Sequence, residues 1–133
     1  MNQAYRQMIV LRKDLNMRKG KMVAQGAHAS LGGVLMGRTI HERDDGTFEL
    51  HVPLSPALHA WLTGRFTKIC VSVKDEQELF DLHRRALEAG IPVCLIQDAG
   101  LTEFGGVPTY TGLALGPETE ETLSPLTGHL PLL

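Results

Sequence analysis

The chain has 133 residues, of which 43% are hydrophobic and 21% charged, and this composition predicts one globular domain over residues 1–133 that needs no disulfide. No apolar stretch is long enough to span a bilayer, so we expect no membrane partner. Residues 1–7 are polar, unlike a secretory signal, and a cytoplasmic protein is therefore expected.

The charge of the chain is unevenly distributed. The net charge of −2 argues against a nucleic-acid partner, because phosphate contacts need clustered cations. Residues 1–38, however, hold seven of the thirteen lysines and arginines and only one of the fifteen acidic residues. This segregation indicates one face for an anion and one for solvent, although ordinary surface variation produces such patterns too.

Strands and helices alternate along the chain. Residues 7–11 predict a buried first strand, and a polar turn then leads into a helix over residues 20–34. Apolar residues recur in that helix at three- and four-residue spacing, a pattern that normally packs on a core: Val23, Ala27, Leu31 and Val34.

Residues 37–67 follow a different pattern. Alternating residues on both sides of Asp44-Asp45-Gly46 predict a hairpin. Ser55 and Pro56 then begin a short helix that carries Leu58, Trp61 and Leu62. We interpret this hairpin-like insertion as an appendage to the core.

The second half of the chain returns to the alternation. Residues 68–73 and 92–97 predict core strands around a helix over residues 76–89, whose inward residues are expected to be Leu79, Leu82, Ala86 and Leu87. Residues 111–115 predict a fourth strand, and Pro117 is expected to start a short acidic helix. Continuous apolar strands separated by helices predict an α/β fold whose sheet is covered on both faces.

Cysteine and histidine give no sign of a metal site. Cys70 and Cys94 both lie within apolar runs, which predicts buried thiols rather than a metal pair. The five histidines other than His28 show no metal spacing, and no Gly-x-Ser-x-Gly elbow is present. Neither a metal nor a covalent serine or thiol mechanism is expected.

A cationic turn opens the first helix. Arg18, Lys19 and Lys21 lie at its N-terminus, where each cation is unfavourable by roughly 0.3 to 1 kcal/mol. A bound phosphate would relieve this conflict, and a solvated basic turn that tolerates it fits equally well. The spacing of a Walker loop is missing.

Asp98 directly follows a buried strand, in the position where open α/β sheets gather their ligands. The residue is suited to act as a general base, as a substrate-orienting group or as a cap for the next loop. His28 lies within the apolar part of the first helix, where a lone histidine is usually packed and hydrogen-bonded.

Several separate motifs occur in an order that resembles the archaeal and eukaryotic type of peptidyl-tRNA hydrolase. Only residues 37–67 look foreign, being longer than the usual connection in that family. The matching stretches are Met8-Ile9-Val10-Leu11-Arg12-Lys13-Asp14-Leu15, Lys19-Gly20-Lys21, Ala24-Gln25-Gly26-Ala27-His28-Ala29, Leu95-Ile96-Gln97-Asp98-Ala99-Gly100, Leu115-Gly116-Pro117, and Leu126-Thr127-Gly128-His129-Leu130 with Leu132.

The resemblance implies a three-layer sandwich, with a mixed four-stranded sheet between helices, and often a homodimer. It also implies hydrolysis, without metal or cofactor, of the ester that joins a peptide to the terminal ribose of tRNA. Position by position, Lys21, Asp98, Thr102 and Thr111 correspond to functional positions and are expected to be catalytic, while Gln25 and His28 lie in the motif. Together with the cationic turn of Arg18, Lys19 and Gly20, these two are expected to bind the substrate. The role of His28 in the motif is open, because a structural role fits it too.

The sequence departs from the family pattern after Gly100. Leu101-Thr102-Glu103 stands where Arg-Thr-Gln is common, so a cation is lost and a carboxylate gained, which is expected to weaken tRNA binding. The following loop is one residue longer than usual, so Thr109 competes with Thr111 for the same role. Two alternatives follow: a catalytically silent RNA-binding or interaction module, and a hydrolase of another small ester or amide whose pocket residues 37–67 shape.

Overall fold

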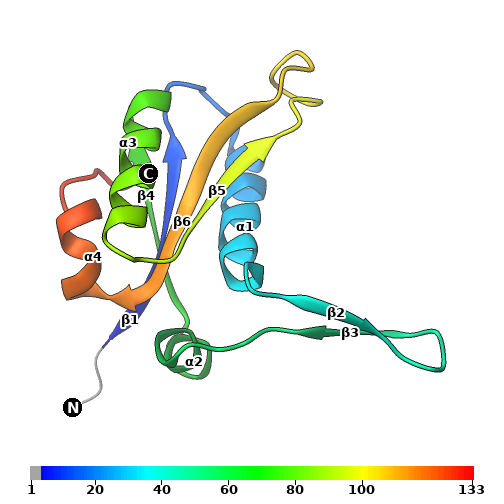
Figure 1. The fold of residues 1–133 in the computed structure, drawn as a ribbon. Helices are drawn as coiled ribbons and strands as arrows, with labels where there is room; N and C mark the ends of the chain where they lie inside the picture. The colour runs from blue at the N-terminus through cyan, green and yellow to red at the C-terminus, as the bar shows by residue number, and fades with distance from the viewer. Residues whose placement is uncertain (1–3) are drawn as a thin grey trace.

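A mixed four-stranded sheet forms the centre of the computed structural model, which describes residues 4–133 (Figure 1). The first three residues of the polar start of the chain lie outside the described part. The strand order is β4-β1-β6-β5, with β4 Thr67–Val73, β1 Tyr5–Arg12, β6 Thr109–Thr119 and β5 Val93–Asp98. β1 is parallel to β4 and antiparallel to β6, and β6 is antiparallel to β5.

Helices cover both faces of this sheet, as predicted. Helix α1, Lys19–Leu35, packs on one face, and helices α3, Glu76–Glu88, and α4, Glu120–Thr127, pack on the other (Figure 1). Each face has its own apolar cluster, the larger one on the α3 and α4 side. The molecule is therefore a three-layer α/β sandwich. None of the helices described in residues 4–133 is long and apolar enough to cross a membrane.

The central strands β1 and β6 approach one another closely near the carboxyl end of β1. A Cβ at Gly112 of β6 would collide with the carbonyl oxygen of Val10 on β1, so only glycine fits at this point. The neighbouring residue, Thr111, is fully buried.

Helix α1 presents the opposite face to the sheet from the one that its periodicity predicted. Val23 and Leu31 are 73% and 59% exposed, whereas the buried residues of the helix are Gln25 and Ala29. Small residues face the sheet because the helix lies very near it: a Cβ at Gly33 would lie 3.1 Å from Nε2 of Gln7. The prediction of the inner face was wrong, and an apolar stripe is left on the outside.

Three further expectations are wrong. Leu87 is 60% exposed, since the buried face of α3 is formed by Leu79, Leu82 and Ala86. Cys70 is exposed because it points to a part of the sheet that α1 leaves open, although Cys94 is half-buried and burial raises the pKa of its thiol. Pro117 belongs to β6, and α4 begins later, with the Thr119 hydroxyl accepting from the amide of Thr122.

The inserted segment forms the expected hairpin and short helix. Strands β2, Thr39–Glu42, and β3, Phe48–His51, pair antiparallel and extend away from the body (Figure 1). Helix α2, Pro56–Thr63, is not an appendage, because Trp61 is 1% exposed and its indole N–H donates to the carbonyl of Thr67 over 2.7 Å.

The orientation of α3 is testable with two leucines of one helix. Leu79→Ala should lower the free energy of unfolding by about 2–5 kcal/mol, because it empties a buried site, whereas Leu87→Ala should stay within about 0.5 kcal/mol of the unmodified chain. Urea denaturation of both variants measures this, and equal losses would contradict the assignment of the buried face.

Candidate active site

The sheet brings two distant segments together at one edge. β1 and β5 are both antiparallel to β6, so they run in the same direction and their carboxyl ends share an edge. Helix α1 begins shortly after the end of β1, and Asp98 is the last residue of β5. The topology therefore puts the first turn of α1 beside Asp98, at the usual ligand-binding edge of an α/β sheet.

Lys21 lies at the centre of this meeting point. Its Nζ donates to Oδ1 of Asp98 over 2.9 Å and to Oγ1 of Thr102 over 2.8 Å. The Lys21 and Asp98 side chains are only 12% and 13% exposed. The ring of Phe104 also lies near the ammonium, with its centroid 5.4 Å from Nζ. A positive charge is thus fixed at a partly enclosed point of the surface.

Asp98 is held by more than the lysine. Its Oδ1 also accepts from Nε2 of Gln25 over 3.0 Å, and its Oδ2 accepts from the amide of Gly100 over 2.7 Å. Gly100 has a φ of +81°, and a Cβ there would collide with the backbone of Val107, so this turn requires glycine. Both oxygens of the carboxylate are therefore engaged.

A chain of hydrogen bonds leads from Asp98 through Gln25 to Thr111 of β6. The hydroxyl of Thr111 donates to Oε1 of Gln25 over 2.6 Å, and both residues are buried. The hydroxyl of Thr109 instead donates to the carbonyl of Val107. Of the two competing threonines, Thr111 is the one that joins the site.

The hydrogen bond from Lys21 holds the pKa of Asp98 below its usual value, and the Gly100 amide and Gln25 act in the same direction against the effect of burial. A carboxylate with a low pKa is a weak base near neutral pH. Of the roles that the sequence left open for Asp98, the low pKa disfavours the general base, and the contact with the Gly100 amide fits the cap of the next loop. The contact with Lys21 makes Asp98 a residue that holds this ammonium as well.

The remaining candidate residues lie around this centre rather than in it. Lys19, Gly20 and His28 are exposed on α1. Within residues 4–133, no side-chain hydrogen bond joins Lys19 or His28 to the five residues of the centre, which are Lys21, Gln25, Asp98, Thr102 and Thr111. Arg18 is the N-cap of α1, and Glu103 accepts from its amide over 3.4 Å and lies 3.9 Å from its guanidinium. A carboxylate of the chain itself therefore offsets part of the cationic conflict at this helix end.

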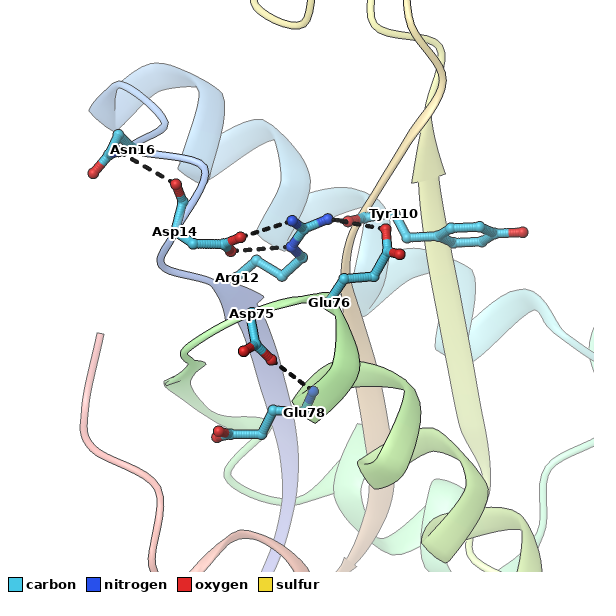
Figure 2. A network of polar contacts seen from close by, with 7 residues as sticks. All are labelled: Arg12, Asp14, Asn16, Asp75, Glu76, Glu78 and Tyr110. Atoms are coloured by element: carbon cyan, nitrogen blue, oxygen red, sulfur yellow. Dashed lines mark hydrogen bonds and ion pairs between the residues drawn. The ribbon is translucent and has the colours of Figure 1, made fainter.

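Sequence reasoning missed a second polar network, which reaches the strand of Thr111 at Tyr110 (Figure 2). Arg12, at the end of β1, makes two hydrogen bonds to Asp14, one to Glu76 of α3 and one to the carbonyl of Tyr110, next to Thr111. The pairing raises the pKa of Arg12 and lowers that of Asp14. The only signal in the sequence was a pair of opposite charges two residues apart after a buried strand.

No group of three or more potential metal ligands lies close together within residues 4–133. The site therefore offers an ammonium, a fixed carboxylate and hydroxyls, which together suit the stabilisation of a developing negative charge.

The low pKa of Asp98 makes a prediction about stability. The ion pair of Asp98 contributes its full stabilisation at a pH above 3.8, the ordinary pKa of aspartate. This stabilisation is lost as the pH falls through the lower pKa that Asp98 has in the folded chain. The free energy of unfolding of the unmodified chain should therefore be higher than that of Asp98→Asn at neutral pH, and the difference should shrink below pH 3.8. Urea denaturation across this range measures the effect, and a pH-independent difference would contradict the stabilising role of the pair.

Comparison with known proteins finds relatives over nearly the whole chain. The family model described as peptidyl-tRNA hydrolase PTH2 matches residues 5–133. The peptidyl-tRNA hydrolase of Methanopyrus kandleri is 41% identical over 129 residues, covering 97% of this chain and 98% of its own. Those of Methanocaldococcus jannaschii and Thermococcus onnurineus are 38% and 40% identical, covering 95% and 97% of this chain and 97% and 98% of their own. The chain belongs to the PTH2 family of peptidyl-tRNA hydrolases.

Proposed function

We propose that this protein hydrolyses the ester between a peptide, or an N-blocked aminoacyl group, and the 3′-terminal ribose of tRNA. The contact of the Lys21 ammonium with Asp98 and Thr102, at the edge where α1 begins, carries the proposal. Family membership supports the same reaction. No observation favours the silent module or the hydrolase of another ester.

The reaction adds water to the ester carbonyl and breaks the bond to the ribose oxygen. Negative charge grows on the carbonyl oxygen in the transition state, and a proton from the water ends on the ribose oxygen. An ammonium has three N–H donors, of which Lys21 gives two to Asp98 and Thr102. The third is free to bind the carbonyl oxygen, and this stabilisation is worth several kcal/mol in a preorganised site.

The surrounding residues act through Lys21 or beside it. Asp98 holds the ammonium in place through its hydrogen bond. The Thr102 hydroxyl accepts from Lys21, so its own O–H is free to bind the attacking water or the oxyanion. Thr111 is a positioning residue, since its hydroxyl is used to hold Gln25 against Asp98.

The exposed residues of α1 are suited to the tRNA. Arg18 and Lys19 offer charges to the phosphates, and Gly20 allows the backbone to be approached, since nothing lies within 4 Å of its Cβ position. His28 lies seven residues after Lys21, and so about two turns along the same side of the helix, where it can contact the end of the substrate.

The protein acts as a cytoplasmic homodimer in this proposal. The exposed apolar side chains of α1, among them Val23 and Leu31, support a protein partner on that side of the helix.

Replacing Lys21 separates chemistry from binding. Lys21→Ala should lower the rate of peptide release from peptidyl-tRNA by about 10²–10³-fold, while affinity for tRNA changes by less than about fivefold. The matched variant Lys19→Ala should weaken tRNA binding and leave the rate at saturation unchanged. Single-turnover hydrolysis and tRNA binding of both variants test this. Peptide release unaffected by Lys21→Ala would contradict the proposed chemistry.

Glu103 should oppose tRNA binding. Glu103→Gln removes a negative charge beside the helix end and frees Arg18, so the affinity for tRNA should rise about two- to fivefold at low salt and the gain should fall as salt is added. Titration at several salt concentrations measures the change. Weaker binding by this variant would instead assign Glu103 a supporting role.

A further inference from the structure

The β2–β3 hairpin has a polar face, whose side chains contact one another, and an exposed apolar face. On the first, the rings of His41 and His51 lie 4.4 Å apart, and Glu49 contacts both His51 and Arg43. The second carries three large apolar side chains, Ile40, Phe48 and Leu50, which are 64%, 66% and 53% exposed. Glu42 lies on this second face, opposite Phe48.

An isolated two-stranded hairpin is marginal in water, and a continuous apolar face on one marks a contact surface. The hairpin leaves the body beyond the end of α1 and extends away from it (Figure 1), so its own body does not cover this face. The rest of residues 4–133 therefore leaves this face open to another molecule.

The body of the protein offers a matching surface. Helix α1 leaves part of its side of the sheet open, between α1, α2 and the β4 edge, where a groove of about 900 Å³ is found. Apolar residues of β1, α1 and α2 line it together with Phe66, among them Leu11, Met22, Leu31 and Trp61, and Cys70 of β4 lies in it as well. Lys19 and Lys68 are the two cations among its lining residues.

Size and charge both fit the hairpin to this groove. Strands of four residues are about 13 Å long, and the part of α1 that lines the groove, from Lys19 to Val34, spans about 22 Å. Lys68 lies over the rings of Trp61 and Phe66, where burial lowers its pKa. Within residues 4–133, neither Lys68 nor Glu42 forms an ion pair.

We propose that the groove receives the β2–β3 hairpin of a second copy of this chain. The apolar face of Ile40, Phe48 and Leu50 packs into the groove, and Glu42 pairs with Lys68 of the partner subunit. A two-fold axis makes the exchange reciprocal, so that each hairpin and each groove is used. This inference rests on the homodimer of the proposed function, and it identifies the surfaces that form it.

Chemical cross-linking tests the location of the hairpin. Cys70 lies in the groove, so Phe48→Cys or Leu50→Cys should form a dimer with a short bis-maleimide, and the linked peptides should contain Cys70 of the partner subunit. The matched controls, Thr39→Cys and Glu49→Cys, lie on the other face of the same hairpin and should link far less. Equal linking from both faces, or no link to Cys70, would overturn the proposal.

The oligomeric state tests the energetics. Phe48→Glu on the hairpin and Leu31→Glu in the groove should each weaken the dimer at least about thirtyfold in sedimentation, whereas Thr39→Glu should not. Glu42→Lys and Lys68→Glu should weaken it singly and restore it together. All these positions are exposed, so the variants should keep the thermal stability of the fold.

Two results would overturn the inference. One is an unmodified chain that stays monomeric up to about 100 µM, and the other is a dimer that survives Phe48→Glu but not Leu31→Glu, since another surface would then fill the groove. Hydrolysis is measured separately on each variant. A monomeric chain that still releases peptide would refute the hairpin exchange and leave the enzymatic proposal standing.

Discussion

The ion pair of Lys21 with Asp98 is the constraint on which the site depends. It joins residues 77 positions apart, and neither side chain has much access to water. Leaving one of these charges unpaired would be costly, so each fixes the other. The parallel course of β1 and β5 makes the pair possible, because it brings the start of α1 and the end of β5 to one edge of the sheet.

Much of the fold followed from the sequence, because apolar strands alternating with amphipathic helices leave few arrangements. The orientation of α1 did not. Its periodicity showed that Val23 and Leu31 share a side, but a pattern does not show what that side meets. Gln25 has a buried partner and the glycines allow close packing, so the polar and small side of the helix faces inward. Cys70 is exposed because α1 leaves the part of the sheet around it uncovered.

For the site, the resemblance named Lys21, Asp98 and Thr102, and the structure brings these three together. Two sets of contacts could not be predicted from the sequence. Gln25 links Asp98 to Thr111 only because of the register and irregular pairing of β5 and β6, which also sends Thr109 elsewhere. Arg12 supports the same strand through the carbonyl of Tyr110, and backbone acceptors carry no signal in side-chain patterns.

A double-mutant cycle on the rate of peptide release tests the central claim most directly. If Asp98 acts by holding Lys21, then Lys21→Ala and Asp98→Asn should each slow single-turnover hydrolysis, and the double variant should be no slower than Lys21→Ala alone. Losses that multiply in the double variant would show that the two residues act independently, and would contradict the role of Asp98 as the residue that orients Lys21.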